Sequence, residues 1–161
     1  MSLRILILAA LMVPCVAVSA PDVPGIYELS FLANGQPTES ILFVGEELVL
    51  KAHVTDSFGV SAEQGSVTFQ FCSRSGGKSF SNMDPAPSFD CDVAGIGTWK
   101  TLITMKVNPG TCGPDSVGYA CVDFGLIRSP RTVGFRFRYV SQGSGIASGM
   151  SASKDAEWVV P

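Results

Sequence analysis

The segment RTVGFRFRYV, residues 131–140, restricts the fold more than any other stretch of this chain. Apolar or aromatic side chains occupy every second position from 133 to 139, and Arg136 and Arg138 lie between them. A helix would place these arginines beside the aromatic rings, whereas successive side chains of a β-strand point to opposite faces of a sheet. The alternation therefore predicts a strand with buried rings on one face and solvated guanidinium groups on the other.

The same period of two recurs along most of the chain. Glycine and proline pairs separate the alternating stretches, and no stretch of ten or more residues after residue 20 has helical spacing. Short strands divided by turn residues are typical of antiparallel sandwiches and barrels, so the sequence predicts an all-β fold. The clear strands are expected at residues 48–54, 67–71 and 103–107, and weaker ones at 26–32, 40–44, 119–124 and 156–160.

The first residues of the chain carry the features of a secretory signal peptide. An apolar run at residues 5–13 follows an arginine, and small residues stand at Ala17, Ser19 and Ala20. The run is shorter than the roughly 20 residues that a transmembrane helix requires. We therefore expect residues 1–20 to be removed on export, by cleavage after Ala20 or Ala17. Residues 21–161 are expected to form a single domain.

Because of this signal peptide, we expect a secreted, cell-surface or periplasmic protein with no membrane span once the signal is cleaved. A lipid anchor on Cys15 is the alternative, because bacterial lipoproteins are acylated on a cysteine near the end of the apolar run. The residue before it, Pro14, fits that motif poorly.

The cysteines beyond the signal are even in number, as expected for a protein that folds in an oxidising compartment. Their proximity in sequence favours two of the possible disulfides, although four cysteines allow three pairings. A zinc site is the alternative, but the chain has no C-x-x-C pair and its one histidine is far from every cysteine in sequence. The favoured disulfides are Cys72–Cys91 and Cys112–Cys121.

Two longer stretches resemble a known class of domain. The segment VGEELVLKAHVTD, residues 44–56, leads into one strand, and GSVTF at residues 65–69 begins the next. Residues 131–160 follow with an aromatic strand, a Gly/Ser loop and a last strand. These features resemble bacterial immunoglobulin-like (Big-type) repeat domains of secreted and cell-surface proteins. The resemblance implies an immunoglobulin-like antiparallel β-sandwich of about seven to nine strands, with a structural, adhesive or protein-binding function.

Groups that could perform chemistry are sparse. The one histidine, His53, is expected on the outward face of its strand, and the chain lacks a G-x-S-x-G nucleophile elbow. Asp90 and Asp92 could offer oxygen ligands to calcium, but no D-x-D-x-D-G series accompanies them, so a solvated acidic loop is the expectation. We therefore predict that the protein is not an enzyme and needs no cofactor or metal.

The composition excludes one class of partner. The net charge of −3 argues against nucleic acid, whose phosphates need a basic face. An unknown protein or glycan at the extracellular surface is expected. The alternative function is a carbohydrate-binding or calcium-assisted lectin-like module, in which Trp99, Asp90 and Asp92 contact the ligand. Core packing is the expected use of Trp99 and Trp158, since large aromatics dominate sandwich cores. Loops carry recognition in sandwiches, and the longest expected here are residues 73–90, 109–118 and 141–152.

Overall fold

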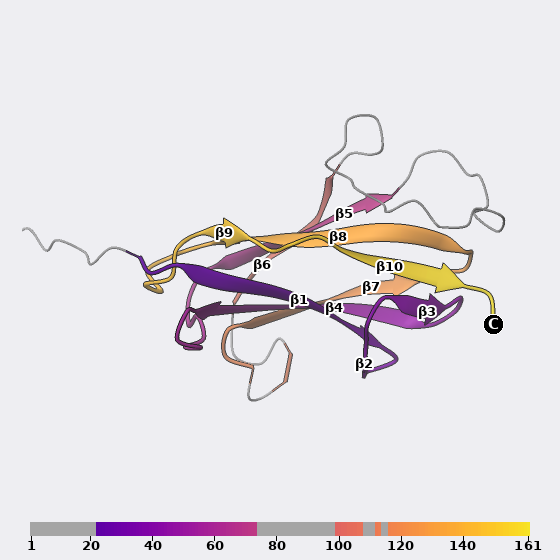
Figure 1. The fold of residues 1–161 in the computed structure, drawn as a ribbon, viewed down its shortest axis with the longest axis horizontal. Helices are drawn as coiled ribbons and strands as arrows, with labels where there is room; N and C mark the ends of the chain where they lie inside the picture. The colour runs from indigo at the N-terminus through magenta and orange to yellow at the C-terminus, as the bar shows by residue number, and fades with distance from the viewer. Residues whose placement is uncertain (1–21, 74–98, 108–111, 114–115) are drawn as a thin grey trace, which may run out of the picture.

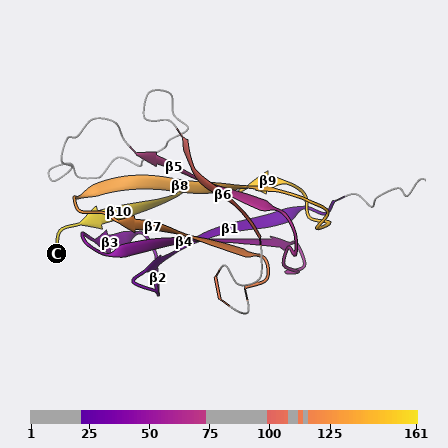
Figure 2. The same ribbon diagram turned by 180° about the vertical axis from the view of Figure 1, so that it is seen from behind.

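The computed structural model describes residues 22–73, 99–107, 112–113 and 116–161, which form ten β-strands and no helix. No helix that could cross a membrane therefore occurs in this part of the chain. Three of the strands span only two or three residues. The strands, drawn in Figures 1 and 2, are β1 (Gly25–Ala33), β2 (Gln36–Thr38), β3 (Ile41–Phe43), β4 (Glu47–Asp56), β5 (Ser66–Ser73), β6 (Lys100–Lys106), β7 (Tyr119–Leu126), β8 (Arg131–Val140), β9 (Gly149–Met150) and β10 (Lys154–Val159).

Two sheets pack face to face and are seen nearly edge-on in Figure 1. The first sheet has the order β2-β1-β4-β7, and the second has the order β3-β10-β8-β5-β6 with β9 added to β8. In an immunoglobulin sandwich, strands A, B and E share one sheet and strands C, F and G share the other. Strands β1, β4 and β7 and strands β5, β8 and β10 follow this arrangement, so the fold is an immunoglobulin-like β-sandwich.

One pairing departs from the predicted antiparallel pattern, because β3 runs parallel to β10. The chain first reverses at Asn34-Gly35, whose φ angles are 48° and 79°, and this two-residue turn pairs Ala33 with Gln36. Asn-Gly favours such turns because both central residues need positive φ. Residues 39–40 then bend the chain across to the second sheet. There the short β3 covers an edge of β10 that would otherwise offer unpaired backbone groups.

Aromatic rings from both sheets fill the core. Phe124 of the first sheet lies 4.8 Å from Phe135 and 6.2 Å from Trp158, measured between ring centroids. Phe31, also from the first sheet, meets Phe135 edge-on at 5.7 Å. Such tilted and edge-to-face contacts stabilise aromatic clusters beyond the area they bury. The predicted inward face of β8 is confirmed, since Val133, Phe135, Phe137 and Tyr139 are all at most 2% exposed.

The predicted faces are also right for β4 and β5, but wrong in part for β6. Alternate residues of β4 from Leu48 to Val54 are fully buried, whereas Ile103 of β6 is 40% exposed. The register between β5 and β6 shifts at Phe69 and Gln70, and no described strand pairs with the other side of β6. An irregular edge strand exposes side chains that simple alternation assigns to the core.

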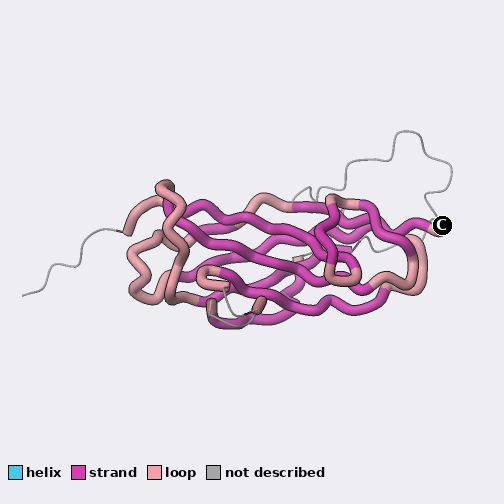
Figure 3. The backbone as a smooth tube through the Cα atoms, turned by 90° about the horizontal axis from the view of Figure 1, so that it is seen from below, coloured by secondary structure: helices cyan, strands magenta, loops and turns pink. Residues whose placement is uncertain are grey.

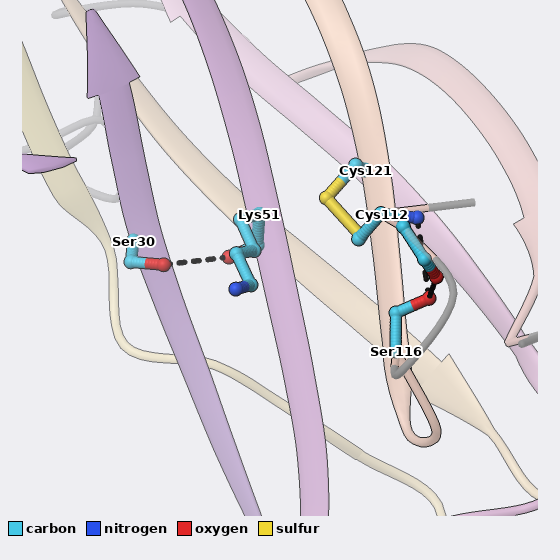
Figure 4. The surroundings of a disulfide bond; sticks show 6 residues. Ser30, Lys51, Cys112, Ser116 and Cys121 are labelled. Atoms are coloured by element: carbon cyan, nitrogen blue, oxygen red, sulfur yellow. Dashed lines mark hydrogen bonds between the residues drawn. A yellow bond between two sulfur atoms is a disulfide. The ribbon is translucent and has the colours of Figure 1, made fainter. Parts of the chain in front are cut away.

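A disulfide joins Cys112 to Cys121 on the outer face of the first sheet, as the sequence predicted (Figure 4). Its strand partner there is Lys51, which lies opposite Cys121. Cys72, buried in β5, is also disulfide-bonded, and its expected partner Cys91 lies outside the described residues. Disulfides of this kind are typical of proteins that fold in an oxidising, non-cytosolic compartment.

Candidate functional site

Loops from the two sheets meet at one end of the sandwich, the left end in Figure 1, and Figure 3 shows them gathered there. Residues 57–65 connect β4 to β5, and residues 141–148 connect β8 to β9. The Tyr139 hydroxyl joins the two loops. It donates a hydrogen bond of 2.6 Å to the Gln64 carbonyl and lies 2.6 Å from the Ser144 hydroxyl. The two loops therefore form one connected surface.

A single carboxylate holds the turn at residues 56–60. Asp56 Oδ1 accepts hydrogen bonds of 2.8 Å from the backbone N–H groups of Phe58 and Val60. The Asp56 N–H donates to the Val60 carbonyl, and the Gly59 N–H donates to the Asp56 carbonyl. Gly59 has a φ of 84°, which glycine adopts without steric cost. These hydrogen bonds fix the turn, and so they fix the direction in which the Phe58 side chain leaves it.

Exposed apolar side chains lie on this turn and on the segments that are hydrogen-bonded to the end of β4. Ile26 pairs with Thr55 across the strands, and the residue after Val117 accepts a hydrogen bond from the Val54 N–H. Apolar groups gathered in water at one place mark a candidate contact surface. The set, here named the apolar tip, comprises Phe58 (85% exposed), Val60 (62%), Ile26 (45%) and Val117 (41%).

Negative charge borders the apolar tip. Asp22, Glu28 and Glu63 are exposed beside it. The described segments that form this end are residues 22–30, 53–65, 116–119 and 141–150, and they contain no lysine or arginine. Basic residues lie on the strands that adjoin these segments, among them Lys51 of β4, Lys106 of β6, and Arg138 of β8, which lies opposite Met150. The Lys51 ammonium sits 4.2 Å above the Tyr119 ring, and Lys106 lies opposite Ser66 on the second sheet.

His53 lies near the apolar tip on the outer face of the first sheet, as the sequence predicted. Its ring stacks on Tyr119 with 3.9 Å between centroids, and its Nε2 is 3.2 Å from the Ser61 hydroxyl. Burial lowers the pKa of His53; Glu28 acts against this shift and Lys51 reinforces it. The neutral imidazole thus links the loop that carries Phe58 to β4.

A hydroxyl, an imidazole and a carboxylate lie next to one another here, from Ser61, His53 and Glu28, as they do in a catalytic triad. Their distances differ from those of a triad. His53 Nδ1 is 3.8 Å from the nearest Glu28 oxygen, which is beyond hydrogen-bond distance. The acid of a triad must hold the imidazole in one tautomer through that bond. The Glu28 side chain is also 70% exposed. Within this cluster, the contact that joins the loop to β4 is the one between Ser61 and His53.

Trp99 does not lie in the core, so that prediction is wrong. It precedes β6, and the Arg136 guanidinium lies 4.1 Å from its ring centre. Arg136 also donates from Nε to Gln70 Oε1 at 2.8 Å, on the outer face of the second sheet. The cause is the irregular edge at β6, which breaks the alternation that linked Trp99 to the core. The prediction for Trp158 is confirmed, because it is 1% exposed.

The predicted ligand contacts of Asp90 and Asp92 stay predictions. Asp90, Asp92 and nearly all of loop 73–90 lie outside the described residues. Within the part of the chain that the structure describes, no group of three or more His, Cys, Asp or Glu side chains could hold a metal ion. Loop 141–152 does contribute to the end surface, whereas loop 109–118 is described only in part.

An open groove of about 430 Å³ runs between β1 and residues 152–154. Lys154, its one cation, is already engaged: its ammonium lies 4.9 Å above the Phe31 ring and 3.8 Å from a Glu39 oxygen. Trp99 does not line this groove. The aromatic residue that does line it is Tyr27, whose hydroxyl donates a hydrogen bond to the Ala147 carbonyl.

The fold and the site define an immunoglobulin-like β-sandwich with a disulfide on its outer face and an aromatic-tipped loop at one end. No protein-family model matches the sequence, and a search of curated proteins finds no match. The resemblance to Big-type repeat domains therefore stays a prediction that rests on the sequence motifs.

Proposed function

We propose that this protein is a non-enzymatic, secreted or cell-surface immunoglobulin-like domain that binds a protein partner through the apolar tip. The observation that carries the proposal is Phe58, which is 85% exposed on a turn held by the Asp56 carboxylate. A large ring on a fixed turn loses little conformational freedom when it enters a partner's pocket, so most of its burial contributes to affinity. Aromatic anchors of this kind dominate the energetics of protein interfaces.

The neighbouring contacts support the same use. Val60, Ile26 and Val117 are further exposed apolar side chains on segments joined to the end of β4, and a ring of weaker contacts that excludes water is the usual setting of an anchor residue. His53 and Tyr139 tie the loop to the sandwich from two sides, through Ser61 and Gln64. A surface held in this manner needs little rearrangement on binding.

Binding of the labelled domain to intact cells of the producing organism tests the proposal. We expect Phe58→Ser to weaken binding at least about fivefold, since losing an anchor costs over roughly 1 kcal/mol. The matched control is Ile41→Ser, because Ile41 is also well exposed, at 62%, but lies on β3 away from this end. Equal binding by both variants would contradict the proposal.

Treating the cells separates the two candidate classes of ligand. Protease treatment should abolish binding if the partner is a protein, whereas periodate oxidation should abolish it if the partner is a glycan. A glycan result that depends on Trp99 and not on Phe58 would favour the carbohydrate-binding alternative. Mass spectrometry of the exported protein, before and after reduction, would test export itself by giving the mature N-terminus and the disulfide pairing.

A further inference from the structure

We infer that the partner presents an apolar pocket bordered by lysine or arginine, an inference that rests on the proposed function of the apolar tip. The tip supplies four exposed apolar side chains, and the charged side chains on the segments that carry it are acids. The basic residues Lys51, Lys106 and Arg138 lie on the adjoining strands. A surface of this composition complements a cationic rim around an apolar centre.

The acids come from separate segments of this end. Glu63 follows the turn that carries Phe58, and Glu28 lies two residues along β1 from Ile26. Asp22 precedes Val23, which pairs with Ile146 in the loop from the second sheet. The Asp56 carboxylate is excluded from this set, since it accepts two backbone hydrogen bonds within the turn.

The same charges disfavour two other occupants. An anionic lipid surface would repel the carboxylates that border the tip, and so would a phosphate backbone. A neutral apolar partner would leave the exposed carboxylates without a function in recognition. Complementary charge at the rim of an interface acts mainly on the association rate, whereas the buried anchor acts on the dissociation rate. The inference therefore predicts a kinetic signature that separates the two roles.

The test uses the full mature domain and a random-peptide phage library. We expect selection to enrich peptides with an apolar or aromatic centre flanked by Lys or Arg, and Phe58→Ser to abolish their binding. For a synthetic copy of an enriched peptide, the double variant Glu28→Gln/Glu63→Gln should lower the association rate constant by roughly three- to tenfold and leave the dissociation rate unchanged. Added salt should remove this difference between the two proteins.

The matched control is Glu47→Gln/Glu157→Gln, which makes the same change in net charge at exposed positions on β4 and β10 outside this end. It should leave the association rate close to that of the unmodified domain. If the control slows association equally, the effect comes from net charge and the inference fails.

The remaining outcomes separate this inference from the proposed function. Phe58-dependent peptides with neutral or acidic flanks would overturn the cationic partner and leave the apolar tip as a protein-binding site. Peptides that bind the Phe58→Ser variant equally well would overturn both. Vesicles of phosphatidylcholine, alone or mixed with phosphatidylserine, provide the last arm, and Phe58-dependent binding to either would identify a membrane and overturn both.

Discussion

Asp56 controls the most exposed ring in the described part of the molecule without touching that ring through its side chain. Its carboxylate accepts hydrogen bonds from the backbone of Phe58 and Val60, so it acts on the turn and not on a ligand. Hydrogen bonds to a charged acceptor are stronger than those between neutral groups. The loss of this acceptor should therefore free the turn while leaving the apolar residues in place.

Replacing Asp56 with alanine should lower the free energy of unfolding by about 1 kcal/mol, because two backbone donors lose their acceptor at a partly solvated site. It should also weaken binding to the partner, because Phe58 then samples more directions before it binds. Urea unfolding and the cell-binding assay measure the two effects. Asp56→Asn, which keeps an acceptor oxygen, should recover most of both. An equal loss in Asp56→Asn would mean that the charge matters and not the acceptor.

His53 should make stability depend on pH in a defined window. Its pKa is lowered from the ordinary value of 6.5 in the folded protein, chiefly by burial, so the unfolded chain takes up a proton at a higher pH than the folded chain does. Stability from this group is therefore fully present above pH 6.5 and decreases as the pH falls toward the folded pKa. The opposite slope would show that His53 is stabilised in its charged form.

Urea midpoints at several pH values between about 7.5 and 5.5 measure this effect, since ordinary carboxylates titrate below that range. His53→Gln is the control, because glutamine can still bond to Ser61 but does not titrate. Its midpoint should vary less with pH than that of the unmodified protein. If the two curves are parallel, the pH dependence arises from other groups.

At this scale the sequence could predict the direction of His53 but not the importance of Phe58. Alternation along residues 48–54 places His53 outward, and local spacing is enough for that. Phe58 lies in a turn, where side-chain direction depends on hydrogen bonds and not on a strand period. The segment DSFG does contain a local signal, an aspartate two residues before an aromatic residue that precedes glycine. That pattern permits the observed turn, but it does not reveal which other apolar groups the fold gathers around it.

Among the elements, the strands with one fully buried face were the ones that the sequence could predict. Strands β4 and β8 have neighbours on both sides, so their inward residues must be apolar and their pattern is regular. The edge strands gave weaker signals. β2 and β9 are too short to show a period, and β6 carries a register shift that misplaced Ile103 and Trp99. The parallel pairing of β3 depends on contacts across the molecule, which local sequence does not encode.

The Cys112–Cys121 disulfide provides a prediction at the scale of one element. It closes a short loop, with a sequence separation of 9, onto the edge strand β7. Cross-linking a loop of this length restricts the unfolded chain by about 2–3 kcal/mol. The double variant Cys112→Ser/Cys121→Ser should therefore lose about that much unfolding free energy in a urea titration. The change should raise the unfolding rate more than it slows folding if the loop orders late.

Val117 lies between the two bonded cysteines and belongs to the apolar tip. The same double variant should therefore weaken binding modestly, and less than Phe58→Ser does, because Phe58 sits on a separate turn. A loss of binding as large as that of Phe58→Ser would indicate that the cystine segment, and not the Asp56 turn, carries the contact.

For the whole molecule, the aromatic core is what makes the two sheets one unit. Phe135 contacts Phe31 and Phe124 from the opposite sheet, and Phe124 also contacts Trp158. The sequence predicted that such a filling exists, because the rings of residues 131–140 share one face. Which rings meet across the sheets depends on how the layers pack, and periodicity along one strand carries no information about that.

Phe135→Ala tests this role, because Phe135 is fully buried at the contact between the sheets. Removing a buried ring costs about 3–5 kcal/mol when the surroundings relax only in part. If the aromatic core couples the sheets, unfolding should stay a single transition in fluorescence and circular dichroism, with a lower urea midpoint and an unchanged m-value. Phe58→Ser is the surface control and should change stability by less than about 0.5 kcal/mol. Two separated transitions in Phe135→Ala would show instead that each sheet holds together without this ring, and that the coupling between the layers arises elsewhere.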